Sequence, residues 1–282
     1  MNKTADLAYW INEREAIRMR KESGVAAPWS NDPLMTTVRY CNIRREDDKV
    51  TKWLANYWRP KYHEVWQILL ARLINNVPTL EGVAMSIAHH GSSWTLENLR
   101  EDLKEWRQNG PIFGNAYTVS TNGRSMDKVD YIIDYVVRPA KEADDAAQPR
   151  WATAIEPTLA GACDTLCMLN GVSTFIAGQV IADLKNTQGH PLQLAPDWHT
   201  WAAPGPGSLR GLEAYYGAPV RPAGFTQALR VCYAEVEPLL ANYARDLHMQ
   251  DFQNCLCEFS KYMRVKNGGH ARNRYSAPTG QH

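Results

Sequence analysis

The sequence predicts a mostly α-helical protein, and three observations support this prediction. Apolar residues recur at helical spacing through most of the 282 residues, as expected of helices that bury one face. The one strand-like run lies at 116–120 and ends at a Thr-Asn-Gly turn. A hydrophobic fraction of 44%, with 10 Trp and 13 Tyr, is enough for a globular core. We therefore expect a helical bundle.

The helices can be followed in chain order from their caps and their apolar stripes. The first is expected over 7–21 after a cap within 4–6, and a polar residue at 30–32 caps a second helix over 34–40. Further amphipathic segments are expected at 49–57, 62–74, 80–89, 95–109, 158–169, 173–185, 208–215, 225–243 and 248–265. Residues 129–138 are predicted to be helical or extended.

Two organisations fit these elements. The chain forms one helical unit, or it forms two lobes, 1–138 and 150–265, joined by an exposed acidic linker at 139–149 that is bounded by prolines. In both cases residues 266–282 are expected to form a basic tail.

Composition excludes several classes of protein. The balance of 31 basic against 30 acidic residues argues against DNA binding by bulk charge, so any contact with nucleic acid requires local patches. No window approaches a membrane span and the first residues lack the apolar stretch of a signal peptide, so we expect no membrane and a cytoplasmic location. The six Cys do not form the C-x-x-C pairs of a zinc site. The histidines have no third metal ligand at a recognisable spacing in the sequence. We therefore expect reduced thiols, no metal and no cofactor.

A helix, a tight Gly-Val-Ser turn at 171–173 and a second helix form the most informative segment. Helix-hairpin-helix DNA-binding proteins use such a hairpin, in which glycine lets backbone N–H groups at the next helix start face a phosphate. Gly171, Ser173 and Thr174 are therefore candidate DNA-binding residues. The alternative is an ordinary helix pair within a helical core.

Asp197 strengthens this interpretation, because helix-hairpin-helix DNA glycosylases carry an Asp downstream of the hairpin that stabilises positive charge on a flipped nucleotide. Residues 155–215 resemble that superfamily, which implies a glycosylase-like helical fold. The lyase members carry a Lys for Schiff-base chemistry where this sequence has Phe175, so the lyase reaction loses its nucleophile. The alternative role for Asp197 is to cap the helix ahead of Trp198.

Several blocks extend the resemblance to almost the whole chain. These blocks are Trp10–Ile17, Pro28–Leu34, Arg39–Thr51, Gly205–Leu212 and Leu256–Arg264. In this order they are similar to the bacteriophage DNA base hypermodification family. That family includes the helical domain of 5-hydroxymethyluracil DNA kinases and the α-glutamyl/putrescinyl thymine pyrophosphorylases, or amino acid:DNA transferases.

The resemblance implies one helical hypermodification domain over 1–282, working in a phage-infected bacterial host on double-stranded DNA that carries modified thymine. It implies a reaction in which an amine or amino acid displaces pyrophosphate from 5-pyrophosphoryloxymethyl-uracil. The donor stays open between glycine, glutamate and putrescine. A kinase would need a P-loop, and the sequence contains no G-x-x-x-x-G-K-[ST] motif, which favours the transferase.

The displacement needs a carboxylate near the developing cation and donors for the departing oxygens. Asp197 is the first candidate for the carboxylate. Arg210 is a candidate to bind the negatively charged leaving group. Backbone N–H groups of Gly205, Gly207 and Ser208 could assist, although this loop also fits a simple helix start. The remaining catalytic candidates are Asn42, Arg44 and Arg45. These three lie in a charged segment that otherwise fits a solvated surface.

Base flipping requires aromatic residues that stack on the extruded base, and Trp29, Trp198 and Trp201 lie beside these motifs. Lys261 and Arg264 begin a basic stretch suited to phosphates. The alternatives are core aromatics and a disordered tail. Two further functions stay open beside the transferase: a glycosylase acting on a modified base, and a non-catalytic DNA-binding partner of a hydroxymethyluracil DNA kinase.

Overall fold

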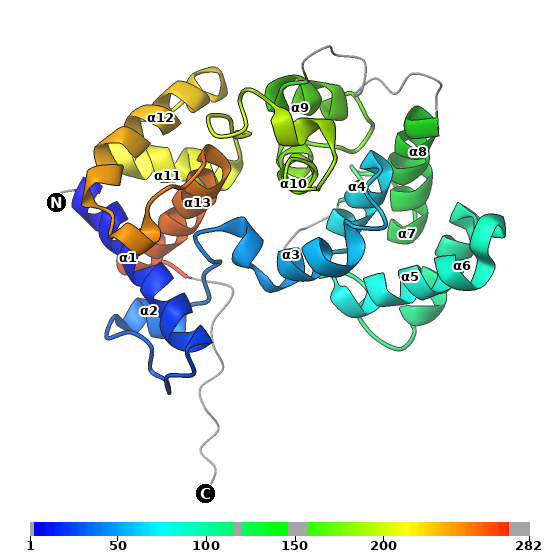
Figure 1. Cartoon of the computed structure of the whole chain (residues 1–282), viewed down its shortest axis with the longest axis horizontal. Helices are drawn as coiled ribbons and strands as arrows, with labels where there is room; N and C mark the ends of the chain where they lie inside the picture. The colour runs from blue at the N-terminus through cyan, green and yellow to red at the C-terminus, as the bar shows by residue number, and fades with distance from the viewer. Residues whose placement is uncertain (1–2, 115–119, 146–156, 271–282) are drawn as a thin grey trace, which may run out of the picture. The chain divides into compact units, whose positions relative to one another are not determined.

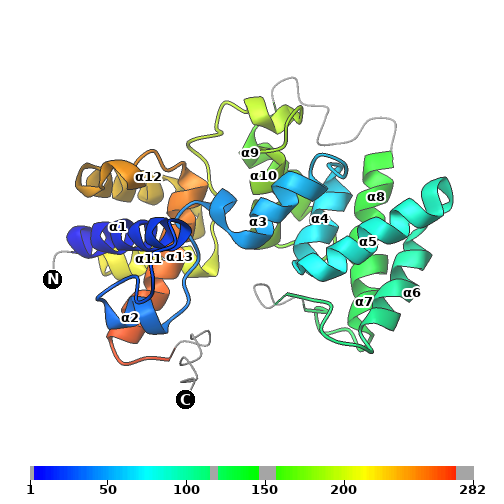
Figure 2. The same cartoon turned by 60° about the horizontal axis from the view of Figure 1, so that its bottom comes forward.

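A computed structural model describes residues 3–114, 120–145 and 157–270, and these residues form helices without a strand. The helices, drawn in Figures 1 and 2, are α1 (Lys3–Glu22), α2 (Pro33–Thr37), α3 (Lys49–Trp53), α4 (Val65–Ile74), α5 (Val77–His90), α6 (Leu96–Trp106), α7 (Lys128–Tyr131), α8 (Arg138–Asp145), α9 (Leu159–Cys167), α10 (Thr174–Leu184), α11 (Pro206–Tyr216), α12 (Phe225–Val236) and α13 (Met249–Lys266). Two π-helical segments, η2 (Leu54–Trp58) and η4 (Ile132–Val137), continue α3 and α7. The prediction of a mostly helical fold is confirmed.

Contacts between Cα atoms divide the chain into two units. Residues 1–48 and 199–282 form one, called here the terminal unit, and residues 49–198 form the other, the middle unit. This division differs from the expected lobes 1–138 and 150–265. The reason is that α1 packs on α12 and α13, whereas α10 of the hairpin packs on α4.

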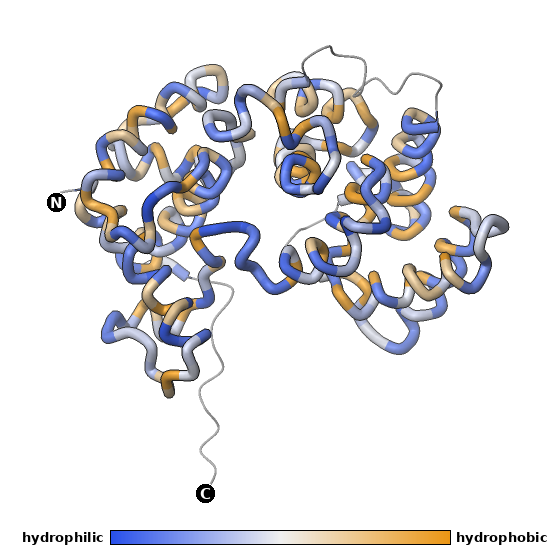
Figure 3. The backbone as a smooth tube through the Cα atoms, in the orientation of Figure 1, coloured by the Kyte–Doolittle hydropathy of each residue, from blue (hydrophilic) through white to orange (hydrophobic). Residues whose placement is uncertain are grey.

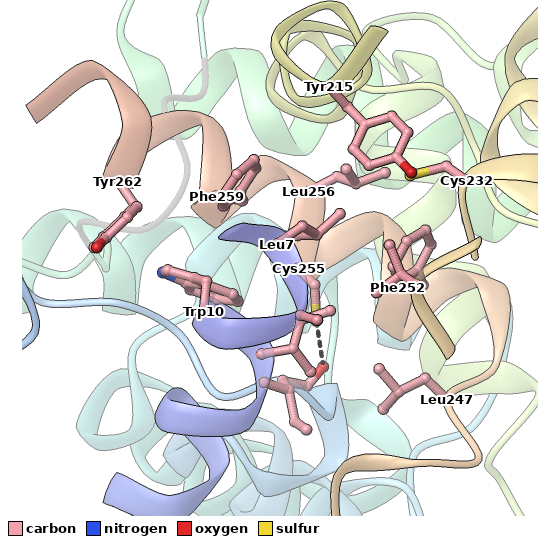
Figure 4. Packing of buried hydrophobic residues seen from close by; sticks show 14 of the residues in the cluster. Leu7, Trp10, Tyr215, Cys232, Leu247, Phe252, Cys255, Leu256, Phe259 and Tyr262 are labelled. Carbon is pink, nitrogen blue, oxygen red and sulfur yellow. Dashed lines mark hydrogen bonds between the residues drawn. The ribbon is translucent and has the colours of Figure 1, made fainter. Parts of the chain in front are cut away.

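A large apolar cluster holds the terminal unit together. Figure 4 shows Leu7 and Trp10 of α1 beside Phe259 and Cys255 of α13, and all four side chains are buried. Burying an aromatic or aliphatic side chain of this size contributes about 1.5–3 kcal/mol. The amphipathic stripes predicted for 7–21 and 248–265 therefore meet in one core.

Helix α10 lies at the centre of the middle unit. Its residues 176–184 are all buried, and it packs against both α4 and α9. Figure 3 shows hydrophobic residues gathered along this helix. A helix that is buried on every side is mostly apolar, as Val180, Ile181 and Leu184 are, and its buried polar residues are Gln179 and Asp183.

Several local predictions need correction or fall outside the described residues. The expected linker at 139–149 is helical as far as Asp145, because α8 continues the turn of η4. Helix α13 extends into the expected tail, and its Lys266 pairs with Asp6 at 3.3 Å. The predicted helix over 225–243 ends at Val236. The strand-like run 116–120 and the tail beyond 270 lie almost wholly outside the described residues.

Across the described helices, none combines the length and the apolar composition that crossing a bilayer requires.

Candidate functional site: a hairpin and a cationic cluster

The predicted hairpin is present as α9, a turn at 168–173 and α10. Gly171 adopts φ +78°, the left-handed conformation for which the sequence predicted a glycine. A Cβ at this position would lie 2.7 Å from Cγ2 of Val136 and 2.8 Å from the Tyr131 hydroxyl. Gly171 therefore faces the protein interior, and its substitution would disturb the fold before it disturbed any DNA contact.

The exposed side of the turn is formed by its neighbours. Met168 is 65% exposed, and Asn170 and Ser173 are also exposed. The Ser173 side chain caps α10 by accepting a hydrogen bond from the Ile176 N–H, at 3.4 Å. Thr174 is half-buried at the first helical position. A helix start at the surface is the element that can receive a phosphate.

Asp197 lies at the other end of α9. Its carboxylate accepts hydrogen bonds from the Leu159 N–H at 2.7 Å and the Ala160 N–H at 3.0 Å. Asp197 therefore caps the first turn of α9. The alternative in the sequence analysis, a cap for a helix that begins at Trp198, is not what the structure shows. A carboxylate has about four acceptor sites in all. These two contacts fix its position, and the carboxylate can still accept further hydrogen bonds.

Trp198 is tied to a fully buried lysine. Its indole N–H donates to the Lys185 carbonyl at 3.0 Å, and the Lys185 ammonium donates to the Trp198 carbonyl at 3.0 Å. The same ammonium lies 3.9 Å from the Trp198 ring centroid. These contacts hold the indole against the protein, which favours a structural role over base stacking.

Sequence reasoning missed a buried ion cluster at the end of α10. Asp183 is fully buried and receives a two-pronged contact from Arg72 of α4, with one arm at 2.6 Å. Arg59, which follows η2, lies 3.6 Å from the same carboxylate. One feature of the sequence could have revealed this cluster: Arg72 and Asp183 are charged residues that each interrupt a hydrophobic stretch. Such clusters are frequent both in structural cores and at functional sites.

In the terminal unit, the segment 41–48 is held by a dense polar network. Asn42 receives a hydrogen bond from Arg14, and its own amide donates to the Asp47 carbonyl at 2.8 Å. Arg44 pairs with the buried Glu15 at 2.9 Å and donates to the Arg245 carbonyl at 2.8 Å. Burial raises the pKa of the neighbouring Asp48, which the Asn42 N–H opposes. Asn42 and Arg44 thus organise this segment.

Three of the predicted cations act electrostatically on Cys257 of α13. Burial raises the pKa of this thiol, the Glu258 carboxylate raises it further, and Lys261, Arg210 and Arg45 oppose these effects. Lys261 also pairs with Glu258 at 2.6 Å, and the Arg45 backbone N–H donates to Asp251 at 2.9 Å. Part of this positive charge is neutralised by Glu258, and the binding of an anion by these residues stays a prediction.

The glycine loop before α11 has a packing role. Gly205, Gly207 and Ser208 are buried, and the Ser208 hydroxyl contacts Gly205 and receives a hydrogen bond from Gln253 at 3.1 Å. A Cβ at Gly207 would lie 2.1 Å from the Cys257 sulfur. These contacts bring α11 close to α13. They do not support the prediction that Gly205, Gly207 and Ser208 present backbone N–H groups to a phosphate, either of the DNA or of the leaving group.

The remaining candidates also lie in the terminal unit. Trp29 is partly buried against the apolar cluster, and its indole N–H donates to the Val25 carbonyl at 2.6 Å. Trp201 is half-buried and Arg264 is exposed. Their assignment to base stacking and to phosphate binding stays a prediction.

Comparison with known proteins identifies the family of this helical domain. The chain belongs to the family described as "5-hmdU DNA kinase, helical domain", whose model matches residues 2–271. It is also similar to a 5-hmdU DNA kinase of Bacillus phage SP10, with 24% identity over 288 residues. The match covers 90% of this chain and 44% of that protein, so the chain spans less than half of its relative's length. No solved structure matches.

Proposed function

We propose that this protein modifies thymine in phage DNA by replacing the pyrophosphate of 5-pyrophosphoryloxymethyl-uracil with an amine or an amino acid. The family match over 2–271 is the observation that carries the proposal, because it relates the chain to enzymes named for a modified pyrimidine in DNA. The proposed displacement needs no nucleoside triphosphate, and the 282 residues contain no P-loop motif that would bind one.

The proposed step is a displacement at the 5-methylene carbon. The amine nitrogen forms a bond to this carbon, the carbon–oxygen bond breaks, and its electron pair leaves with pyrophosphate. The nitrogen then loses a proton to a base. Negative charge therefore grows on the departing oxygens and positive charge on the carbon, and both need oppositely charged groups.

Each unit by itself offers a candidate for one kind of group. In the terminal unit, Arg45, Arg210 and Lys261 all act electrostatically on Cys257 and are the candidates to bind the departing pyrophosphate. Asp197 is held by two backbone N–H groups and is the candidate to stabilise the cation or to accept the proton. The exposed start of α10 is the proposed contact with the DNA backbone.

The direct test gives purified protein duplex DNA containing 5-pyrophosphoryloxymethyl-uracil and a panel of amines and amino acids. We expect pyrophosphate release and a heavier nucleoside by mass spectrometry, and no reaction on 5-hydroxymethyluracil, because hydroxide is a poor leaving group. A free base with an abasic site would replace this proposal with the glycosylase. Unchanged DNA with every donor would replace it with a non-catalytic DNA-binding partner.

Two variants test the assigned residues. Asp197→Asn should reduce the rate about 10²–10³-fold, and Arg210→Ala should reduce it by the equivalent of about 1.5–3 kcal/mol, the value of a hydrogen bond to a charged group. Arg221→Ala is the matched control, because Arg221 is exposed in the same unit and its side chain makes no cap hydrogen bond. Thermal unfolding must accompany Asp197→Asn, since Asp197 also caps α9. A folded variant with normal product yield would remove that residue from the mechanism.

A further inference from the structure

The terminal unit contains two carboxylates to which no role has yet been given. Glu258 of α13 accepts a hydrogen bond from the Cys41 N–H at 3.0 Å, and Asp48 accepts one from the Asn42 N–H at 3.1 Å. Cys41 and Asn42 are neighbours in the sequence. Successive backbone N–H groups therefore hold the two carboxylates in one region.

Two basic side chains contact the same region. The Arg14 Nε atom donates to the Cys41 carbonyl at 2.9 Å, and the Lys261 ammonium pairs with Glu258 at 2.6 Å. Arg14 also acts electrostatically on Asp48. Groups of both signs are therefore present for a reaction in which positive and negative charge develop on different atoms.

Two buried donors in this region have no hydrogen-bond partner among the described residues. One is the Nη1 atom of Arg14, and the other is the hydroxyl of Tyr40, a residue that is 8% exposed. The Lys261 ammonium lies 5.0 Å from the Tyr40 ring centroid. A buried donor without an acceptor is costly, so a ligand that brings oxygen atoms, such as a pyrophosphate ester, would stabilise both.

Asp48 is the carboxylate that can exchange a proton with a ligand. Its Oδ1 atom accepts the Asn42 N–H, whereas its Oδ2 atom has no hydrogen-bond partner in the described part of the chain. Asp48 is half-buried, so a ligand can reach it, whereas Glu258 is buried and paired with Lys261.

The surroundings of Asp48 also suit a base. Burial raises the pKa of this carboxyl, and the Glu258 carboxylate raises it further. The Asn42 N–H, Arg45 and Arg14 oppose these effects. A carboxylate with a raised pKa accepts a proton more readily, and a general base works best when its pKa is near the operating pH.

The residues of this region come from three of the five sequence blocks that resemble the hypermodification family. They are Arg14 in the first block, Tyr40 and Asp48 in the third, and Glu258 and Lys261 in the last. Cys41 and Glu258 lie 217 residues apart in the sequence, and the fold brings them into contact.

We propose that Asp48 is the base of the displacement and that its Oδ2 atom accepts the proton which the amine nitrogen loses. The nitrogen bonds to the 5-methylene carbon, the carbon–oxygen bond breaks, and its electron pair leaves with pyrophosphate, for which Arg14 and Lys261 offer donors. Asp48 has this role only if the displacement occurs, so the assignment rests on the proposed function. It gives the proton to the terminal unit, whereas Asp197 belongs to the middle unit.

Steady-state kinetics test this role on duplex DNA containing 5-pyrophosphoryloxymethyl-uracil, with whichever donor of the panel reacts. Asp48→Asn keeps an oxygen for the Asn42 N–H but removes the base, so kcat should fall about 10²–10⁴-fold while KM changes little. Asp48→Glu restores a carboxylate and should recover about tenfold or more of the lost rate.

Asp47→Asn is the matched control for these variants. Asp47 is the neighbouring carboxylate, and it pairs with Arg18 at 3.4 Å, so its kcat should equal that of the wild type. Thermal unfolding shows whether each variant is folded.

The pH profile of kcat is a second readout, which a merely structural role would not move. A base works in its deprotonated form, so the rate should rise with pH as Asp48 loses its proton. Glu258→Gln removes a negative charge that raises the pKa of Asp48, so the acidic limb of the profile should move to lower pH. An acidic limb that stays in place would overturn the assignment, even if Asp48→Asn does not fold.

The same assay separates this role from the proposed function. If the wild-type protein releases pyrophosphate and a folded Asp48→Asn variant has a normal kcat, Asp48 is not the base and the transferase stands. If the wild-type protein reacts with no donor, the transferase fails and the role of Asp48 fails with it.

Discussion

Helices α10 and α11 both begin after a glycine-bearing turn, and the sequence predicts a phosphate contact at each, but the two turns differ in the structure. Before α10, Gly171 faces inward while Asn170 and Ser173 remain exposed. Before α11, Gly205, Gly207 and Ser208 are all buried, and Gly207 lies against Cys257 of α13. Only the first turn presents a helix start at the surface.

This difference shows that a glycine before a helix has two common explanations. It can free backbone N–H groups for a ligand, or it can let two helices approach closely. The pair Gly207 and Gly211 serves the second purpose, since a Cβ at Gly211 would lie 2.3 Å from the Leu256 carbonyl oxygen. Exposure of the residues around the glycine distinguishes the two cases.

The largest expected effect concerns the support of α10. Asp183→Asn leaves Arg72 and Arg59 buried beside a neutral side chain, and breaking a buried ion pair from one side costs about 3–5 kcal/mol. Urea unfolding measures this change. Asp145→Asn is the control, because the side chain of Asp145 is 56% exposed and its pair with Lys141 contributes about 0–1 kcal/mol. If both variants are equally stable, the cluster does not support the helix that follows the hairpin.

The next effect tests close packing before and along α11. Gly211→Ala forces a methyl group against the α13 backbone, and we expect a loss of about 1–3 kcal/mol, as for other overpacked sites. Gly224→Ala is the matched control in the same unit, since nothing lies within 4 Å of a Cβ there and φ is −95°. Thermal unfolding of both variants measures the contrast. Equal melting temperatures would contradict the packing role given to these glycines.

The smallest effect tests the exposed turn before α10. Ser173→Asp keeps a good helix cap and adds a negative charge where a phosphate is proposed to bind. Repulsion between unit charges about 4 Å apart is about 1 kcal/mol even in water, so duplex affinity should fall roughly fivefold. Thr95→Asp makes the same change at the exposed cap of α6 and should leave affinity unchanged. Fluorescence anisotropy at one fixed salt concentration measures both, and an equal loss in both would locate DNA binding elsewhere.

The sequence by itself determined the helical class, most helix positions and the hairpin, because apolar periodicity, caps and a left-handed glycine are local properties. Gly171 has the left-handed conformation that the predicted turn requires, whereas the structure adds that Ser173 caps α10. Family membership followed from motifs spread along the chain.

Tertiary structure decided the partners of each charged group, since these depend on segments far apart in the sequence. Asp197 accepts hydrogen bonds from the N–H groups of Leu159 and Ala160, which lie 38 and 37 residues earlier in the sequence. Asp183 accepts from Arg72, which lies 111 residues earlier. Arg45, Arg210 and Lys261 come from three segments, and all three act electrostatically on Cys257. Periodicity shows which face of a helix is buried, but it does not show which other helix covers that face, and the chemistry of a site depends on that pairing.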